Sequence, residues 1–192
     1  RLTRDTLRPF VGKHPRLKSW LNARARGVEA LRHAASGLLP TLVRPRTRNL
    51  TIAVTARCNL RCVGCRYGRD FMVGHQLPLG LVRELLDDAA ADGVETIRLY
   101  GGEPLLHDDL PAMVAHAVTR GLSPYVTTNA TLLDRRIDEL FDAGLRTITV
   151  GFYGTDEAYD AYTGNARGFA QMERGVAAVR DRFGDDVRLR LN

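Results

Sequence analysis

Cys58-Asn-Leu-Arg-Cys62-Val-Gly-Cys65 closely follows an apolar run from Leu50 to Thr55 and contains all three cysteines of the 192-residue chain. A closed structural zinc site or an all-cysteine iron–sulfur cluster takes four protein ligands, so three thiolates leave one metal position open. A small-molecule substrate or cofactor can bind at such a position. An odd number of closely spaced cysteines also favours metal or redox chemistry in a reducing compartment over a disulfide framework. The stretch therefore predicts an open metal centre directly after a strand.

The chain around this stretch alternates between short apolar runs and longer helical patterns. Such alternation is typical of parallel strands joined by crossover helices. The expected strands are Leu50 to Thr55, Thr96 to Tyr100, Tyr125 to Thr128, Thr147 to Phe152 and Val187 to Leu191. The expected helices run from Pro78 to Gly93, from after Asp109 to before Gly121, from Leu133 to Asp142 and from Gly168 to Phe183.

Repeated strand–helix units form either a full or partial barrel or an open Rossmann-like sheet. The first strand is followed by the cysteine loop and lacks the Gly-x-Gly-x-x-Gly turn of a dinucleotide site. The sequence therefore predicts an α/β fold built as a full or partial TIM-like barrel. A length of 192 residues with 44% apolar and 26% charged residues suits one ordinary globular core.

Polar or glycine-rich segments follow four of the expected strands, where the loops of a barrel meet at one mouth. Besides the cysteine loop, these are Gly101-Gly102-Glu103-Pro104, Thr127-Thr128-Asn129 and Gly151 to Gly154. We therefore expect all four segments to face one site.

The spacing Cys58-x3-Cys62-x2-Cys65, combined with Gly101-Gly102-Glu103-Pro104 one strand later, resembles the signature of the radical S-adenosylmethionine (radical SAM) enzymes. The resemblance implies that the three cysteines hold a [4Fe–4S] cluster whose fourth iron is chelated by S-adenosylmethionine (SAM). It covers residues 50–192 as a radical SAM core domain. The family's core is a partial (β/α)6 barrel, so a chain with about five strands looks truncated at its C-terminal end.

The same resemblance implies contacts to the cofactor. Gly101 and Gly102 would approach the amino group of its methionine moiety, and Glu103 would offset the ammonium charge. Thr128 and Asn129 correspond to polar positions at the ribose or the methionine carboxylate. Arg190 and Asn192 share one face of the last expected strand, so either could reach that carboxylate. An arginine that is simply exposed at the edge of the sheet is an equally open interpretation.

Two positions depart from the family pattern. The residue before the last cysteine is commonly bulky and packs near the adenine, whereas here it is Gly64, whose backbone contacts can survive the change. We expect Arg66, Tyr67 or Phe71 to replace the lost packing. At the fourth strand the family often has a serine, and this chain has Gly151.

The histidines allow one chemical alternative, because His75 would complete a Cys3His zinc site with the three cysteines. That alternative gives the Gly-Gly-Glu segment and the barrel pattern no role. Otherwise His75 and His107 are expected to be solvated loop residues near the mouth, and a substrate contact is the less favoured role for them.

Residues 1–49 form a basic extension, although the net charge of the whole chain is only +6. This segment has few acidic residues, and the remainder of the chain has more acidic than basic residues. Apolar residues recur at near-helical spacing, with Gly27 and Gly37 as breaks, which predicts short basic amphipathic helices. Such helices pack Trp20 and the leucines onto the core, lie at an anionic membrane surface, or guide an anionic substrate.

The implied activity is reductive cleavage of SAM to methionine and a 5′-deoxyadenosyl radical, which abstracts hydrogen from a substrate. A small-molecule or lipid-linked substrate is the first hypothesis, with flavodoxin or ferredoxin as electron donor. The chain lacks a secretory signal and a membrane-spanning run, so we expect a cytoplasmic protein, with peripheral membrane contact through residues 1–49.

Two other functions stay open. The segment from Phe152 to Gly164 resembles a branch of the family that matures cofactors or modifies peptides. An iron–sulfur redox sensor is the non-enzymatic alternative, and it would not need Glu103. Nucleic acid is an unlikely partner, because the basic residues near the cysteines are few and the core is acidic overall.

Overall fold

The computed structural model describes residues 14–38, 47–67 and 69–192. The chain divides into two compact units, residues 1–46 and residues 47–192, which are described separately. In the first unit the described residues form one helix, α2 (Pro15–Leu38), of 24 residues. The expectation of short helices broken at Gly27 and Gly37 is wrong, because both glycines keep a negative φ and continue the helix. Within the described residues, no helix is long and apolar enough to cross a membrane.

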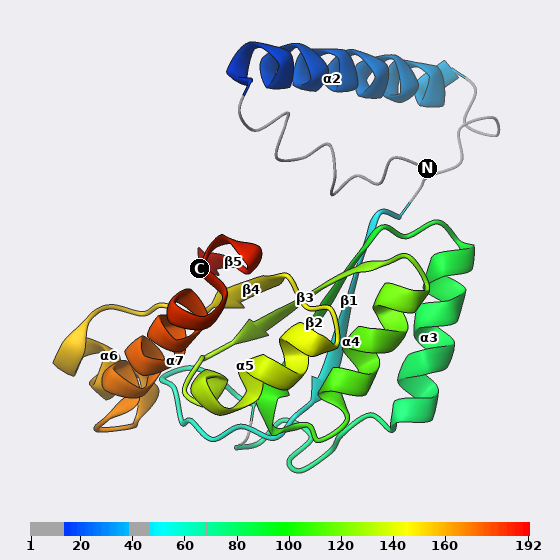
Figure 1. The fold of residues 1–192 in the computed structure, drawn as a ribbon. Coiled ribbons are helices and arrows are strands. Elements are labelled where there is room, and N and C mark those ends of the chain that lie inside the picture. Colours follow the sequence, from blue (N-terminus) through cyan, green and yellow to red (C-terminus); the bar gives the residue numbers. More distant parts are fainter. Residues whose placement is uncertain (1–13, 39–46, 68) are drawn as a thin grey trace. The chain divides into compact units, whose positions relative to one another are not determined.

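The second unit is built on a five-stranded sheet in the order β1-β2-β3-β4-β5 (Figure 1). Every neighbouring pair of strands is parallel. The sequence order runs straight across the sheet, without the reversal that defines a Rossmann fold. The predicted α/β fold of parallel strands is thus confirmed. The strands are β1 (Asn49–Thr55), β2 (Thr96–Gly101), β3 (Ser123–Thr128), β4 (Thr147–Val150) and β5 (Arg188–Leu191).

Helices connect the strands, and all but α6 (Asp156–Thr163) lie along one face of the sheet (Figure 1). They are α3 (Leu79–Ala91), α4 (Leu110–Thr119), α5 (Leu133–Asp142), α6 (Asp156–Thr163) and α7 (Gly168–Phe183), with the 3-10 turns η1 (Pro104–Leu106) and η2 (Gly184–Asp186). Helix α6 was not predicted. The fourth strand is shorter than expected, because it ends at Val150 instead of Phe152.

Successive side chains along each strand point to opposite faces of the sheet. Residues such as Ile97, Leu99, Val126 and Ile148 are fully buried beneath the helices and form the core. The opposite face, called the inner face below, carries the alternate residues. These are Thr51, Ala53, Arg98, Tyr100, Tyr125, Thr127, Thr147, Thr149, Arg188 and Arg190.

Candidate functional site

The three cysteines lie in the loop that leaves the C-terminal end of β1. All three thiols are free and partly exposed. Burial, reinforced by the neighbouring Glu103, Cys62 and Cys65, raises the pKa of Cys58 to about 11, against the opposing effect of the Leu60 N–H. Burial and the neighbouring Cys65 also raise the pKa of Cys62. Both shifts favour the neutral thiol, and a bound metal ion would favour the thiolate instead, because metals bind the deprotonated form.

A tight turn from Cys62 to Cys65 shapes the end of this loop. The Cys65 N–H donates to the Cys62 carbonyl at 3.2 Å, and Gly64 has a φ of +75°. A left-handed φ at the third position of a turn favours glycine, which explains why a bulky residue is absent there. Arg69 fixes the same turn, since its guanidinium donates to the carbonyls of Cys62, at 2.8 Å, and Cys65.

The Gly-Gly turn after β2 presses against the backbone that leads into the cysteine loop. The Gly102 N–H donates to the Thr55 carbonyl at 2.8 Å, and the Glu103 N–H donates to the Arg57 carbonyl at 2.8 Å. A Cβ on Gly101 would lie 2.1 Å from the Thr55 oxygen, and one on Gly102 would lie 2.2 Å from the Arg57 oxygen. Both positions therefore need glycine for the approach of two backbones, before any cofactor is considered.

Glu103 is fully buried and holds the end of β3. Its Oε1 accepts from the Thr128 hydroxyl at 2.7 Å and from the Leu105 N–H at 3.0 Å. Its Oε2 accepts from the Asn129 N–H at 2.8 Å. Burial raises the pKa of this carboxyl, and the three donors oppose that rise. The side chain thus positions Thr128 and Asn129, and whether it also acts on a ligand stays a prediction.

A second polar network, which the sequence analysis missed, joins the cysteine loop to the loop after β3. Asn129 donates through Nδ2 to the Asn59 Oδ1 at 2.9 Å. Asn59 donates through its own Nδ2 to the Thr131 hydroxyl at 2.8 Å, and that hydroxyl donates to the Asn129 Oδ1 at 2.7 Å. Asn59 lies 70 residues from Asn129 and 72 residues from Thr131 in sequence, so only the fold brings it to them.

Helix α6 supports the other side of the loop. The Arg61 N–H donates to the Thr163 carbonyl at 3.0 Å, and the Val63 N–H donates to the Tyr162 carbonyl at 2.8 Å. These two contacts fasten the segment between Cys58 and Cys65. The sequence signal for this short helix is Gly164, because a glycine commonly ends a helix. In the structure Gly164 is the C-terminal cap and has a φ of +65°.

Tyrosines gather where α6 meets the cysteine loop. The Tyr153 ring stacks on Tyr162 with centroids 4.6 Å apart, and it lies 6.1 Å from Tyr159. A Cβ on Gly151 would lie 2.9 Å from the Tyr153 hydroxyl. The glycine at the position where the family often has serine therefore makes room for this ring. Burial raises the pKa of Tyr153, as do the nearby cysteines and Tyr162.

The remaining predicted residues lie in different surroundings. Asn192 extends β5, since its N–H donates to the Val150 carbonyl at 3.0 Å. Arg190 lies on the inner face, with its guanidinium 6.0 Å from the Tyr125 ring centroid. The interpretation of His107 as a solvated residue is wrong, because it is 4% exposed. Its Nδ1 accepts from the Asp109 N–H and its Nε2 lies 2.9 Å from the Leu77 carbonyl, which makes it a structural residue.

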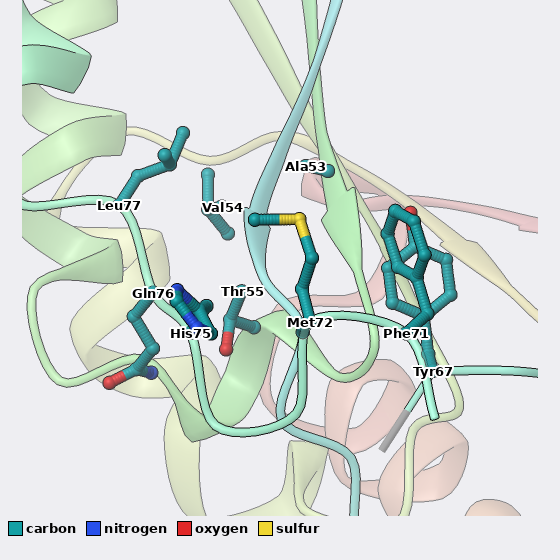
Figure 2. Close-up of a pocket in the computed structure, with 10 residues that line it drawn as sticks. Ala53, Val54, Thr55, Tyr67, Phe71, Met72, His75, Gln76 and Leu77 are labelled. Atoms are coloured by element: carbon teal, nitrogen blue, oxygen red, sulfur yellow. The ribbon is translucent and has the colours of Figure 1, made fainter. Parts of the chain in front are cut away.

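A cavity of about 100 Å³ lies along β1 beside the site (Figure 2). It is lined mainly by apolar atoms of β1 and of the segment from Tyr67 to Leu77. Tyr67 and Phe71 form an edge-on pair with centroids 5.1 Å apart, and Figure 2 shows them together beside Met72. His75 also lines this cavity, and its side chain is exposed.

The donor set fits an iron–sulfur cluster. Three free thiols approach from one loop whose backbone is fixed by the Gly-Gly turn and by α6. In the part of the chain that the structure describes, no three His, Cys, Asp or Glu side chains gather closely enough to hold a single metal ion. In such a cluster each of the three thiolates would bind a different iron, so the ligands need not converge on one point.

The family model described as Radical SAM superfamily matches residues 52–190. Among curated proteins, the GTP 3′,8-cyclase of Chlorobaculum tepidum is 38% identical over 128 residues, 65% of this chain and 38% of that protein. The Fe-coproporphyrin III synthase of Methanosarcina barkeri is 34% identical over 125 residues, 64% of this chain and 31% of that protein. The chain thus spans less than half the length of these relatives.

Solved structures share the fold. SuiB of Streptococcus suis bound to SAM matches with a TM-score of 0.61 and 18% identity, over 76% of this chain and 32% of that one. The SAM-bound anSMEcpe structure matches with a TM-score of 0.62 and 16% identity, over 77% of this chain and 43% of that one. At these identities the likeness concerns the architecture alone.

Proposed function

The chain belongs to the radical SAM superfamily of enzymes, and we propose that it reductively cleaves SAM and removes hydrogen from a small-molecule or lipid-linked substrate. A [4Fe–4S] cluster and SAM are the cofactors of this family, and SAM is bound in solved structures of the same fold. The observation that carries the proposal is the three-thiol loop, fixed at the carboxyl ends of parallel strands against the Gly-Gly turn.

Cys58, Cys62 and Cys65 would hold three irons and leave the fourth to SAM. When bound, the two cofactors supply an electron transfer that cleaves SAM to methionine and a 5′-deoxyadenosyl radical, which abstracts hydrogen from the substrate. The chain's own residues orient the cofactors and exclude water. Arg69 and α6 fix the loop before the cluster is bound, so the ligands need little rearrangement.

The turn at Gly101 and Gly102 is proposed to receive the ammonium group of SAM on its carbonyl oxygens. The N–H groups of Gly102 and Glu103 already donate to the backbone before Cys58, so the turn is held at a fixed distance from the cluster ligands. The amide and hydroxyl groups of Asn129 and Thr128 are proposed to lie near the ribose or the methionine carboxylate. Glu103 would act on SAM through these two residues, which it positions.

The sequence relatives support a small-molecule substrate over a peptide. The two curated relatives are named for GTP and for Fe-coproporphyrin III, and both matches exceed 30% identity. The structural matches to peptide-bound SuiB have only 16% identity and support the fold alone. A lipid-linked substrate, peripheral membrane contact through residues 1–49, and a flavodoxin or ferredoxin as electron donor are proposed together with this function.

The test is anaerobic reconstitution of the full-length protein with iron and sulfide, followed by reduction with dithionite in the presence of SAM. We expect 5′-deoxyadenosine to form, and we expect Cys58→Ala to abolish it because one cluster ligand is lost. Val63→Ala is the matched control, since Val63 is 63% exposed in the same loop and contacts α6 through its backbone. This control should retain both the cluster and the product.

Other outcomes contradict the proposal in distinct ways. A protein that holds the cluster but never forms 5′-deoxyadenosine would favour an iron–sulfur sensor. A protein that retains zinc tightly instead of iron would refute the cofactor assignment.

A further inference from the structure

Tyr153 carries a hydroxyl group that the proposed cofactor contacts do not use. This residue lies in the short segment between the end of β4 at Val150 and the start of α6 at Asp156. The loops that follow parallel strands meet at one edge of the sheet, so this segment and the cysteine loop share that edge.

Two aromatic contacts define the orientation of the Tyr153 ring, although the residue is 45% exposed. The ring stacks on Tyr162 of α6 with centroids 4.6 Å apart and an interplanar angle of 29°, and its centroid lies 6.1 Å from that of Tyr159. Tyr162 also holds the cysteine loop, since its carbonyl accepts from the Val63 N–H at 2.8 Å. Val63 directly follows Cys62 in sequence, so the stack is tied to the backbone of a cluster ligand.

The ring directs its hydroxyl group to the end of β4. A Cβ on Gly151 would lie 2.9 Å from the Tyr153 Oη, so this atom occupies the space in which a side chain at position 151 would begin. Among the residues that the structure describes, none forms a hydrogen bond with this hydroxyl. Its proton can therefore be donated to a group that binds in the site.

The thiols of the cysteine loop act electrostatically on Tyr153. Burial raises the pKa of Tyr153, and the nearby Cys62, Tyr162, Cys65 and Cys58 raise it further. Such an effect weakens with distance, so a contribution from all three thiols agrees with the position that the stack gives the ring. A tyrosine with a raised pKa stays protonated at neutral pH and remains a hydrogen-bond donor.

One thiol already accepts a hydrogen bond from the protein. The Leu60 N–H donates to the Cys58 Sγ at 3.5 Å. Hydrogen bonds to the sulfur atoms are one of the factors that set the reduction potential of an iron–sulfur cluster. Leu60 is a backbone donor within the cysteine loop, whereas Tyr153 approaches that loop from the side of α6.

We propose that the Tyr153 hydroxyl donates a hydrogen bond to a sulfur atom of the [4Fe–4S] cluster or of its cysteine ligands, and that this bond raises the reduction potential of the cluster. The inference rests on the proposed function, because it requires a bound cluster. Reduction adds one electron to the iron and sulfur atoms, and the O–H bond is retained. The reduced form carries more negative charge, so the hydrogen bond stabilises it more than the oxidised form.

The experiment is a redox titration of the anaerobically reconstituted full-length protein without SAM, followed by the electron paramagnetic resonance signal of the reduced cluster. Tyr153→Phe keeps the ring and its stack but removes the hydroxyl. We expect the equilibrium constant for one-electron reduction to fall about threefold to tenfold, where tenfold corresponds to ~59 mV. Tyr162→Phe is the matched control, because it removes the hydroxyl of the other ring in the stack, and it should change this constant by less than about twofold.

Three results would overturn the inference. Tyr153→Phe has the potential of the wild type, or Tyr162→Phe lowers the potential as much, which would assign the effect to the stack. In the third result, Tyr153→Phe weakens SAM binding and leaves the potential without SAM unchanged, which would assign the hydroxyl to SAM.

Cluster content and reductive SAM cleavage by the wild type are measured in parallel. A wild-type protein that binds no cluster refutes the proposed function and this inference with it. A wild type that binds the cluster and cleaves SAM, with a potential equal to that of Tyr153→Phe, refutes the inference alone.

Discussion

Replacement of Glu103 by Gln separates a structural role from a cofactor contact. The carboxylate accepts from Leu105 N–H and the Thr128 hydroxyl on one oxygen, and from Asn129 N–H on the other. In Gln one oxygen becomes an NH2 group, which places a donor against a donor. Depending on which oxygen is replaced, either the Asn129 N–H or the Thr128 hydroxyl and the Leu105 N–H then lose their acceptor.

The expected cost follows from these contacts. Leaving a buried donor without a partner costs about 1–3 kcal/mol, so we expect Glu103→Gln to lower the free energy of unfolding by about 2 kcal/mol. In a domain of this size that corresponds to a fall in Tm of roughly 4–8 °C. Glu103→Ala removes all three acceptor contacts and leaves a cavity, so we expect about 3–5 kcal/mol. Glu84→Gln, at an exposed position of α3, is the control and should leave Tm unchanged.

The assay is thermal unfolding of the reconstituted protein followed by far-ultraviolet circular dichroism, in the absence of SAM. A residue that only contacts SAM would leave this Tm unaltered and lower SAM affinity alone. A Tm for Glu103→Gln within about 1 °C of wild type would therefore refute the structural role.

The pH dependence of the same assay gives a second check. Burial raises the pKa of Glu103, so the folded protein binds this proton more firmly than the unfolded chain does. The associated stability is complete below the ordinary carboxyl pKa and is lost as the pH rises through the raised value. Glutamine does not titrate, so the wild-type advantage in Tm over Glu103→Gln should narrow as the pH rises.

Two further substitutions test the close contacts around the site by the same thermal assay. Gly175→Ala should lower Tm by about 4–8 °C, because its Cβ would lie 2.3 Å from the Ala130 carbonyl oxygen. Gly80→Ala, in open space on another helix, is the control and should raise Tm slightly. Equal effects of the two substitutions on Tm would contradict the close contact at Gly175. Gly151→Ala should destabilise by about 1–2 kcal/mol in the wild type and by almost nothing in Tyr153→Ala, since the Tyr153 ring is what its Cβ would meet. Additive effects in that double-mutant cycle would refute the explanation of Gly151.

The parallel sheet and most of its helices follow from local sequence patterns. Alternation at positions such as Ile97 and Leu99 distinguishes the core face of a strand, and glycines with positive φ end the helices at Gly93, Gly121 and Gly144. Both signals act within a few residues, so no tertiary knowledge is needed. Gly27 shows the limit of this reasoning, since glycine lowers helix stability without preventing a helix.

Helix α6 escaped prediction because it is short and buries few residues. Over its eight residues only Tyr159 and Thr163 are buried, so no apolar stripe is present to reveal the period. Its boundaries were the better signal, with Thr155 before the helix and Gly164 after it.

The roles of individual site residues depended on contacts that sequence spacing does not encode. The resemblance placed Glu103 beside a cofactor ammonium, but its carboxylate is occupied by donors from η1 and β3. Asn59 lies inside the cysteine motif and had no assigned role until the fold brought it to Asn129. Both contacts arise from the pairing of parallel strands, which fixes the loops after β1, β2 and β3 at one edge.

These contacts also imply that the cysteine loop does not depend on its metal for its shape. Small zinc domains fold only when the metal organises the ligands. Here the backbone on either side of Cys62 bonds to α6, and the strand before Cys58 bonds to the Gly-Gly turn. Because the buried core of the sheet holds α6 and that turn, the free energy of the core stabilises the ligand geometry. Substitution of a cysteine should therefore remove the cluster while leaving the sheet folded, whereas substitution of Glu103 weakens the fold first and the cofactor site as a consequence.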